Sequence, residues 1–259
     1  MNPMKTSEKI LHDKLIKETI VFNGHSLQDD YFNITYASDK KFIYGVGVSV
    51  TSVIINNPNM KIHFHIFLDE VDDANRDLFK KLISGTKNKI TIYIMDSAVF
   101  RDLPVPSKTW SAAIYFRLLA IEYLSKSVNF LLYIDSDVIC HNSISSLEEL
   151  TFSNDVLIYA VHDHSRKMDS GLGIDMNKYF NSGLMYMDIK ALTKNNIPDD
   201  VIRLANKNNY TYPDQDALNV LLNQHVINLE EKYNNLFSID GYIGKGHIDK
   251  IVDDVVFIH

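Results

Sequence analysis

An apolar run at residues 130–134 ends on two carboxylates, Asp135 and Asp137, which are separated only by Ser136. Such a short apolar run predicts a buried β-strand. In an open α/β sheet, ligands bind just outside the carboxyl ends of the strands, which is where these two carboxylates would lie. Two anions this close repel each other unless a cation lies between them. The pattern therefore predicts a site for a hard divalent cation, which often carries a substrate's phosphates as well. The alternative is a strand followed by an acidic turn.

Length and composition exclude several classes of protein. The chain has 259 residues, of which 46% are hydrophobic, and this is enough for a sizeable core. A net charge of −7 without a dense Lys/Arg stripe argues against a general nucleic-acid binder. Cys140 is the only cysteine, so no intrachain disulfide can form, and we expect a buried, inert thiol. No secretion signal and no run of about 20 apolar residues is present, so a soluble cytoplasmic protein is expected.

Predicted strands and helices alternate along the chain. Strands are predicted at residues 32–36, 60–68, 90–95, 130–134, 157–161, 184–187 and 255–258. Helices are predicted at residues 5–20 (short and peripheral), 44–56, 72–84, 110–124, 199–207 and 214–223. The alternation predicts a mostly parallel sheet with helices on both faces, in one α/β domain. Residues 1–30 would form an N-terminal extension, and residues 31–259 would form the main domain.

Six short segments occur in an order and spacing that resemble the retaining family 8 glycosyltransferases. They are TYASDKKF (35–42), AAIYFRLL (112–119), YIDSDVIC (133–140), YFNSGLMYMD (179–188), YPDQDALN (212–219) and FIH (257–259). The family includes glycogenin, and the likeness is strongest to the enterobacterial enzymes that add glucose or galactose to the lipopolysaccharide outer core. The resemblance implies a GT-A-like, Rossmann-type nucleotide-diphospho-sugar transferase fold. It also implies transfer of glucose from UDP-glucose, or of galactose from UDP-galactose, to a hexose hydroxyl.

The resemblance assigns residues to the uracil, the metal and the diphosphate. Ala37 and Asp39 would contact the uracil, although a turn or helix cap would also explain Asp39. Asp135 and Asp137, joined by His259, would hold Mn²⁺ or Mg²⁺, and the imidazole favours Mn²⁺. Ser136 would also bind the donor. A histidine at a strand end is the alternative interpretation of His259.

Further residues are assigned by resemblance to the donor sugar and its reacting centre. They are Arg117, Asp163, Asn181, Ser182, Gly183, Asp214 and Gln215, and Arg117, Asp163, Asp214 and Gln215 are also the predicted catalytic residues. A structural salt bridge would also explain Arg117, and an N-terminal helix cap would explain either Asp214 or Asp216.

The implied mechanism is α-hexosyl transfer with retention of configuration. UDP would leave through an oxocarbenium-like transition state, and the acceptor hydroxyl would attack the same face with the departing phosphate as base. Double displacement would need a carboxylate nucleophile, and Gln215 is a poor one. Two other functions stay open on these residues. One is a haloacid-dehalogenase-like phosphatase with Asp135 as nucleophile and Asp137 as acid/base, and the other is a sugar-nucleotide-binding protein without turnover.

The family's pattern continues beyond His259 with a lysine-containing stretch and a basic, aromatic region, and neither is present here. The expectation is that this absent tail would attach the enzyme to the cytoplasmic face of the inner membrane. Its absence puts turnover in question, because the lysine would neutralise charge on the leaving group. The segment at residues 212–222 looks slightly more like the glucose-adding enzymes, so glucose is the preferred donor. A lipopolysaccharide core oligosaccharide is the expected acceptor.

Overall fold

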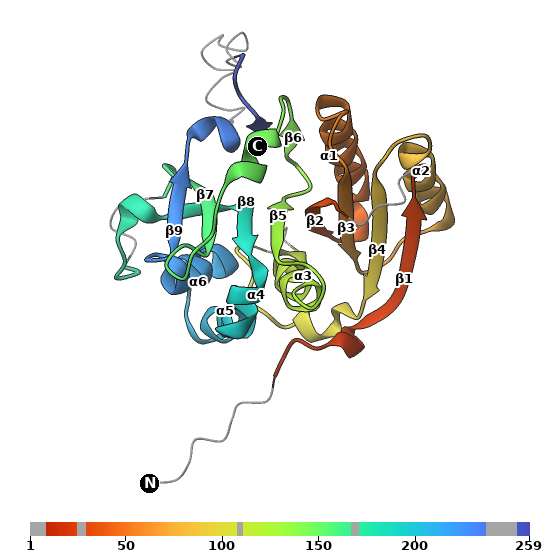
Figure 1. Ribbon diagram of the computed structural model, residues 1–259. Coiled ribbons are helices and arrows are strands. Elements are labelled where there is room, and N and C mark those ends of the chain that lie inside the picture. Colours follow the sequence, from red (N-terminus) through yellow and green to blue (C-terminus); the bar gives the residue numbers. More distant parts are fainter. Residues whose placement is uncertain (1–8, 25–29, 108–110, 167–170, 237–252) are drawn as a thin grey trace, which may run out of the picture.

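The computed structural model describes residues 9–24, 30–107, 111–166, 171–236 and 253–259. Its centre is an eight-stranded sheet with the strand order β1-β4-β3-β2-β5-β8-β7-β9 (Figure 1). The strands are β1 (Ile16–Asn23), β2 (Phe32–Ser38), β3 (Ile62–Leu68), β4 (Lys89–Met95), β5 (Phe130–Ile134), β7 (Ile158–His162), β8 (Phe180–Asp188) and β9 (Val226–Leu229).

The directions of the central strands bring three chain segments together at one end of these strands. The central strands β4, β3, β2 and β5 are parallel, so the predicted mostly parallel central sheet is confirmed. β8 runs antiparallel to β5, with Leu184 paired to Ile134. The carboxyl ends of β2 and β5 therefore lie beside the beginning of β8. This is why the segment before Leu184 can contribute to the same site as Asp39 and Asp135.

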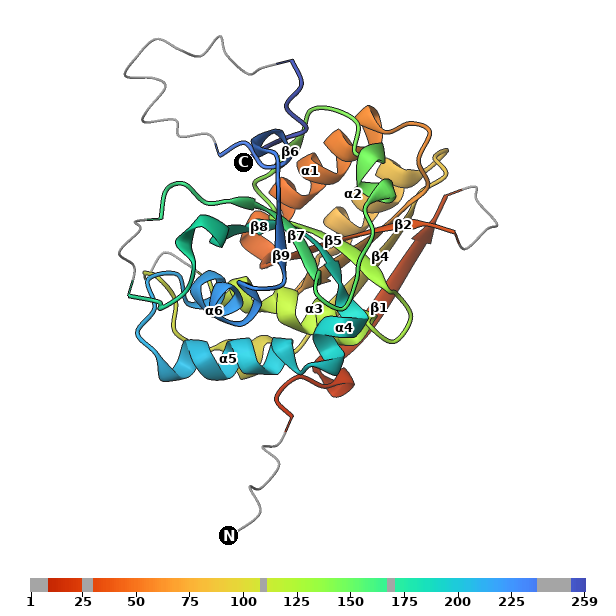
Figure 2. The same cartoon turned by 60° about the vertical axis from the view of Figure 1, so that its left-hand side comes forward.

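Helices cover both faces of the sheet, as predicted (Figures 1 and 2). α1 (Ile43–Asn56) and α2 (Asp73–Ile83) pack on one face, and on the other lie α3 (Phe116–Leu124), α4 (Ile189–Lys194), α5 (Ile197–Lys207) and α6 (Pro213–Leu222). β5 supplies both cores by alternation, since Leu131 and Tyr133 face α3 while Leu132 and Ile134 belong to the core under α1. Phe130 differs from the prediction of a fully buried strand, because it is 41% exposed.

A second, two-stranded sheet joins the end of the described chain to the segment after β5. It consists of β6 (Ile139–Cys140) and β10 (Phe257–Ile258), which are antiparallel with Phe257 paired to Cys140. The pairing places His259 beside the turn that carries Asp137. The thiol of Cys140 is buried, as expected, and burial raises its pKa to about 12.

The predicted helix at residues 5–20 is wrong where the structure describes it. Residues 13–15 form one turn of 3-10 helix, and β1 begins at Ile16 and pairs with β4 at the edge of the sheet. The predicted helix at 110–124 is a 3-10 turn, η4 (Ala112–Tyr115), followed by α3, and Trp110 lies outside the described residues. The sequence analysis missed α4, β6 and β9. The proposed division of the chain at residue 31 stays a prediction.

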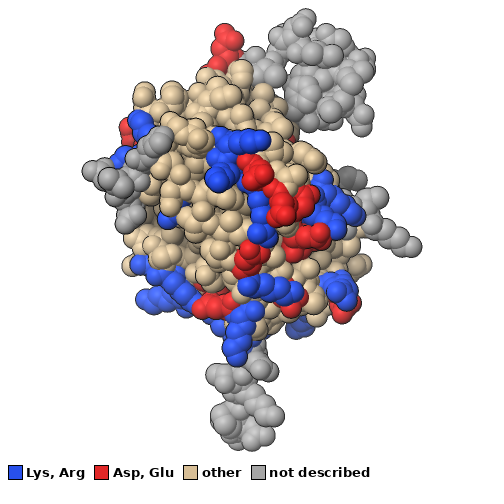
Figure 3. Space-filling model, turned by 90° about the vertical axis from the view of Figure 1, so that its right-hand side faces the viewer, with Lys and Arg blue, Asp and Glu red and all other residues tan. Residues whose placement is uncertain are grey.

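Charged side chains of both signs share the face that carries β1 and α2 (Figure 3). Arg76 of α2 pairs with Glu18 of β1 at 3.0 Å, and Lys17 pairs with Asp96 at 3.4 Å. On this face the described residues therefore form no basic patch of the kind that binds nucleic acid.

Candidate functional site

A cavity of about 430 Å³ opens where the carboxyl ends of β2 and β5 meet the beginning of β8. Every residue that the sequence analysis assigned to a site lines it. They are Ala37, Asp39, Arg117, Asp135, Ser136, Asp137, Asp163, Asn181, Ser182, Gly183, Asp214, Gln215 and His259. The structure thus brings together residues that are up to 222 positions apart, from Ala37 to His259.

Asp135, Asp137 and His259 form the predicted metal-binding group. Each offers one ligand atom, and the three atoms lie within 4.8 Å of one another. The backbone amide of Asp135 donates to the carbonyl of Gly183 at 2.7 Å, and the backbone amide of His259 donates to the carbonyl of Asn235 at 2.9 Å. Two carboxylates and an imidazole suit Mn²⁺ or Mg²⁺, so the donor set fits such an ion.

Gly183 leaves the space in which this group is assembled. A Cβ atom at this position would lie 2.3 Å from Cε1 of His259 and 2.8 Å from Oδ2 of Asp135. Both distances are far below a van der Waals contact, so only glycine permits the two ligands to lie here.

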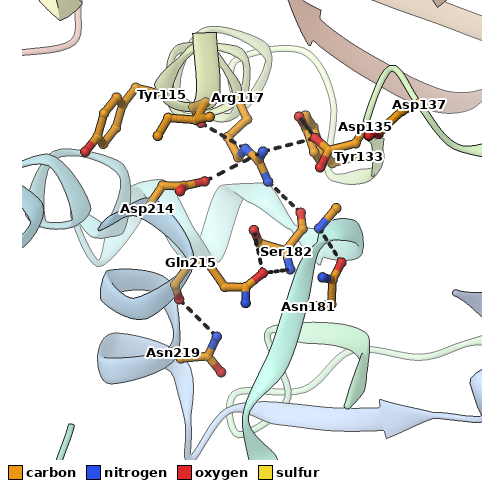
Figure 4. A network of polar contacts seen from close by, with 12 residues as sticks. Tyr115, Arg117, Tyr133, Asp135, Asp137, Asn181, Ser182, Asp214, Gln215 and Asn219 are labelled. Carbon is orange, nitrogen blue, oxygen red and sulfur yellow. Dashed lines mark hydrogen bonds and ion pairs between the residues drawn. The ribbon is translucent and has the colours of Figure 1, made fainter. Parts of the chain in front are cut away.

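Arg117 connects the predicted metal-binding group to the residues that were predicted to bind the donor sugar (Figure 4). These sugar-side residues are Asp163, Asn181, Ser182, Asp214 and Gln215. Its Nη2 donates to Oδ1 of Asp135 at 3.0 Å and lies 3.6 Å from Oδ2 of Asp214. Its Nη1 donates to the carbonyl of Ser182 at 2.6 Å, and the guanidinium lies over the ring of Tyr133 at 4.3 Å. Burial alone would lower the Arg117 pKa, but the neighbouring carboxylates raise it on balance. The structural ion pair expected as an alternative is therefore present, and direct contact with the donor stays a prediction.

Gln215 holds the far side of the cavity together. Its Oε1 accepts the backbone amide of Ser182 at 2.9 Å, while its Nε2 donates to Oδ2 of Asp163 and to the hydroxyl of Tyr179, each at 3.0 Å. Both polar atoms of the amide are thus occupied by protein groups. Asp163 in turn accepts from the Ser165 backbone amide at 3.0 Å. Its predicted contact with hexose hydroxyls stays a prediction.

Asp214 is not the helix cap that was considered as an alternative. Its side chain is buried, and its ion pair is with Arg117. Burial raises the Asp214 pKa, the Arg117 charge opposes this, and the charge of Asp135 adds to it. It is Asp216 that accepts the backbone amides of Thr211 and Tyr212, at 3.0 and 3.1 Å, before α6.

Asp39 and Phe42 form the end of the cavity beside β2. Asp39 caps the 3-10 helix η2 (Lys40–Phe42), since its Oδ1 accepts the backbone amide of Lys41 at 2.9 Å. The cap expected as an alternative is therefore present in a residue that also lines the cavity. Phe42 is 57% exposed at the cavity, although it is a large aromatic side chain. An exposed ring beside a carboxylate and the backbone of Ala37 suits a base that stacks and donates a hydrogen bond.

The cavity is strongly acidic. Among the described residues that line it are the five carboxylates of Asp39, Asp135, Asp137, Asp163 and Asp214, against one guanidinium. A diphosphate would be repelled by such a surface unless a cation accompanies it. The charge balance thus agrees with a divalent ion at Asp135 and Asp137.

The sequence analysis missed residues that support the site from behind. Tyr133 donates its hydroxyl to Oδ1 of Asp135 at 2.5 Å, and Tyr179 donates to Oδ1 of Asp216 at 2.6 Å. Asn234 is bonded to Asn181 and to His259, each at 3.0 Å. Tyr133 and Tyr179 had a sequence signal, because each is the first residue of a segment that carries the family resemblance, whereas Asn234 lies in none of those segments.

Gly45 of α1 sets how closely this helix approaches the turn at Asp135–Asp137. A Cβ at Gly45 would lie 2.5 Å from the carbonyl oxygen of Ser136, whereas one at Gly47, in the same helix, would meet nothing within 4 Å.

Alanine is favoured over glycine in a helix by about 1 kcal/mol. Gly47→Ala is therefore expected to raise the unfolding temperature and to leave Mn²⁺ binding unchanged. Gly45→Ala should displace the turn and weaken Mn²⁺ binding about 10-fold or more. Calorimetric titration measures the Mn²⁺ affinity of the two variants, and thermal unfolding measures their stability. Equal Mn²⁺ affinities of Gly45→Ala and Gly47→Ala would contradict this account.

Known proteins resemble this chain in sequence and in structure. The model of the family "Glycosyl transferase family 8" matches residues 33–259. The lipopolysaccharide 1,3-galactosyltransferase of Salmonella typhimurium is 29% identical over 98% of this chain and 78% of that protein. The lipopolysaccharide glucosyltransferase WaaO of Escherichia coli is 32% identical over 88% of this chain and 70% of that protein. Among solved structures, the galactosyltransferase LgtC with donor and acceptor sugar analogues has a TM-score of 0.73 at 23% identity, over 88% of this chain and 86% of that one. The predicted GT-A fold is thereby confirmed.

Proposed function

This chain belongs to glycosyl transferase family 8, and on that premise we propose that it moves glucose from UDP-glucose to a hexose hydroxyl of lipopolysaccharide. The anomeric configuration is retained. The observation that carries the proposal is the acidic cavity, in which the metal-binding group, Arg117 and the sugar-side residues meet. Galactose from UDP-galactose is the second candidate donor, because the Salmonella relative is a galactosyltransferase by its name.

The metal-binding group would hold Mn²⁺ or Mg²⁺ together with the diphosphate of the donor. When bound, the ion would supply Lewis-acid stabilisation of the negative charge on departing UDP. Asp135 is held for this role from two sides, by the hydroxyl of Tyr133 and by Arg117. A ligand fixed in this way loses little conformational entropy when the ion binds.

The donor's other parts would follow the cavity away from the metal. Ala37, Asp39 and the exposed ring of Phe42 would hold the uracil, with Ser136 close to the ribose and diphosphate. Asp163, Asn181 and Asp214 offer polar atoms to the hexose hydroxyls on the opposite side.

Front-face attack is the mechanism that this arrangement favours. Gln215 is no nucleophile, because its amide oxygen accepts from Ser182 and its amide nitrogen donates to Asp163 and Tyr179. Those bonds instead hold the backbone of Ser182 and the carboxylate of Asp163 in fixed positions. The acceptor hydroxyl would attack from the side that UDP leaves, and the departing phosphate would take its proton. A trapped covalent glycosyl-enzyme would contradict this mechanism.

The haloacid-dehalogenase-like alternative does not fit the topology or the family. Its acidic motif normally opens the fold, whereas four strands, β1 to β4, precede β5 here. The alternative also gives no role to the sugar-side residues that line the cavity.

We place the reaction at the cytoplasmic face of the inner membrane. The named relatives act on lipopolysaccharide, whose lipid part would keep the acceptor at a membrane. None of the described helices is long and apolar enough to cross a bilayer.

The proposal is tested by release of UDP from a panel of UDP-sugars. With Mn²⁺ and lipopolysaccharide core truncated at successive sugars, we expect release from UDP-glucose, and linked hexose should appear on one acceptor. Release of UDP from UDP-galactose instead of UDP-glucose would support galactose as the donor sugar. Hydrolysis of a generic phosphate ester, with no release from any UDP-sugar, would support the phosphatase instead. Binding of UDP-glucose without release would indicate a binding protein.

A further inference from the structure

We propose that Asn234 is a positioning residue that fixes the tautomer of His259, so that the Nε2 lone pair of His259 is directed at the metal-binding group. The inference rests on the proposed function only for the role of His259 as a ligand. The hydrogen-bond chain that supports it begins at a backbone amide and can be followed one proton at a time.

The hydrogen-bond chain begins at Gly183. Its backbone N–H donates to the side chain of Asn181, and the distance from N to Oδ1 is 2.9 Å. A backbone N–H can only donate, so the atom of Asn181 that faces it must be the carbonyl oxygen. The orientation of the Asn181 amide is therefore fixed by chemistry, although nitrogen and oxygen have nearly the same shape.

Asn234 is fixed in turn by Asn181. The second group that approaches Oδ1 of Asn181 is the side-chain amide of Asn234, at 3.0 Å. An oxygen that already accepts can accept again but cannot donate, so Asn234 must present its NH₂ group. The carbonyl oxygen of Asn234 then faces the ring of His259, with Oδ1 at 3.0 Å from Nδ1.

These contacts determine which ring nitrogen of neutral His259 carries the proton. An amide oxygen only accepts, so Nδ1 of His259 must carry the proton. The neutral ring has one N–H, and Nε2 is left with the lone pair. Nε2 is the nitrogen on the side of the acidic pair, at 3.6 Å from Oδ1 of Asp137. The opposite tautomer would direct an N–H at the position of the metal, where it could not be a ligand.

The side chain of Asn234 can be removed without releasing the backbone that carries His259. The backbone amide and carbonyl of Asn235 bond to Phe257 and His259, each at 2.9 Å, so the chain end is held without the side chain of Asn234. Asn234 is 1% exposed, so water has no ready access to replace it at Nδ1. Loss of its side chain should therefore change the tautomer more than the fold.

The first test uses the unaltered, metal-free protein. Histidine ¹⁵N chemical shifts at alkaline pH distinguish a protonated nitrogen from one with a lone pair, and the spectrum of His259→Gln assigns the signal. We expect His259 as the Nδ1–H tautomer. An Nε2–H tautomer would overturn the inference, whether or not any variant folds.

The second test compares Asn234→Leu with Asn235→Leu. Asn234→Leu should populate the Nε2–H tautomer and weaken Mn²⁺ binding about 10- to 100-fold, the usual effect of losing a group that orients a ligand. The rate of UDP release at saturating Mn²⁺ should change far less than the Mn²⁺ concentration needed for half-maximal release. Asn235→Leu keeps the backbone bonds and should change neither. Wild-type Mn²⁺ affinity in a folded Asn234→Leu protein would overturn the inference.

The two proposals fail in different ways. If no UDP-sugar is turned over but His259 is the Nδ1–H tautomer, the proposed function is wrong and the hydrogen-bond chain stands. If turnover occurs with His259 in the other tautomer, the function stands and Asn234 does not position the ring.

Discussion

Replacement of Asp137 by asparagine is expected to lower metal-dependent release of UDP at least about 100-fold, since even a group that only orients a ligand accounts for 10- to 100-fold. Asn keeps the size of the side chain but removes its charge. The carboxylate of Asp137 is 68% exposed, and its contact within the described site is with His259 at 3.6 Å. Little stability should therefore be lost, and the effect is on the cation.

Calorimetry with UDP separates this loss from an effect on folding. Wild-type protein should bind UDP in Mn²⁺ and lose most of that affinity when the metal is chelated, whereas Asp137→Asn should bind UDP weakly under both conditions. Asp77→Asn is the matched control, because Asp77 is an exposed residue of α2 outside the cavity. UDP that binds equally well after chelation and to Asp137→Asn would refute the metal assignment.

The central strands and the site could be predicted because their signals are local. β5 is an apolar run that ends on an acidic pair, and β2, β3 and β4 are similar runs separated by helical patterns. The rule that ligands bind at the carboxyl ends of such strands identified Asp135 and Asp137 as site residues, and the family resemblance added Asp39. The structure brings these three residues into one cavity, because β2 and β5 are parallel neighbours.

β1 was predicted as a helix because an edge strand resembles a short amphipathic helix in sequence. Lys17, Glu18 and Thr19 are exposed, while Ile20 and Phe22 pack against the core under α1. Charged residues on an edge strand prevent further pairing, and they also weaken the alternation that would identify it. Only the pairing with β4 decides between the two structures.

Asn234 could not be found because its partners are distant in sequence. It lies 53 positions from Asn181 and 25 positions from His259. The approach of His259 to Asp137 depends on pairing between β6 and β10, each only two residues long. Such short strands carry no periodicity, so the family resemblance alone brought His259 into the predicted site.

Replacement of Arg117 by methionine is expected to reduce the free energy of unfolding by about 3–5 kcal/mol at neutral pH, the usual effect of removing one partner of a buried ion pair. Met fills much of the same volume but leaves Asp214, whose side chain is 6% exposed, without its cation. Arg76→Met removes the exposed pair with Glu18 and is the control, with an expected loss of about 1 kcal/mol or less.

The dependence of this loss on pH tests whether it is caused by an unpaired carboxylate, chiefly Asp214, which is more buried than Asp135. Burial raises the Asp214 pKa above 3.8 and Arg117 opposes the shift, so Arg117→Met should raise that pKa further. Between 3.8 and the raised value, the native state binds more protons than the unfolded state, so this group's contribution to stability falls as pH rises through the window. The deficit of Arg117→Met relative to wild type should therefore be largest at neutral pH and should shrink as the pH is lowered towards 3.8.

Urea unfolding of wild type, Arg117→Met and Arg117→Lys across this pH range measures the deficit directly. Lysine keeps the charge but not the planar fork that joins Asp135, Asp214 and the Ser182 carbonyl. Arg117→Lys should thus lose less stability than Arg117→Met, with a weaker dependence on pH, and yet release UDP more slowly than wild type. A deficit for Arg117→Met that stays constant, or grows as the pH falls, would show that Asp214 does not depend on Arg117 for its charge.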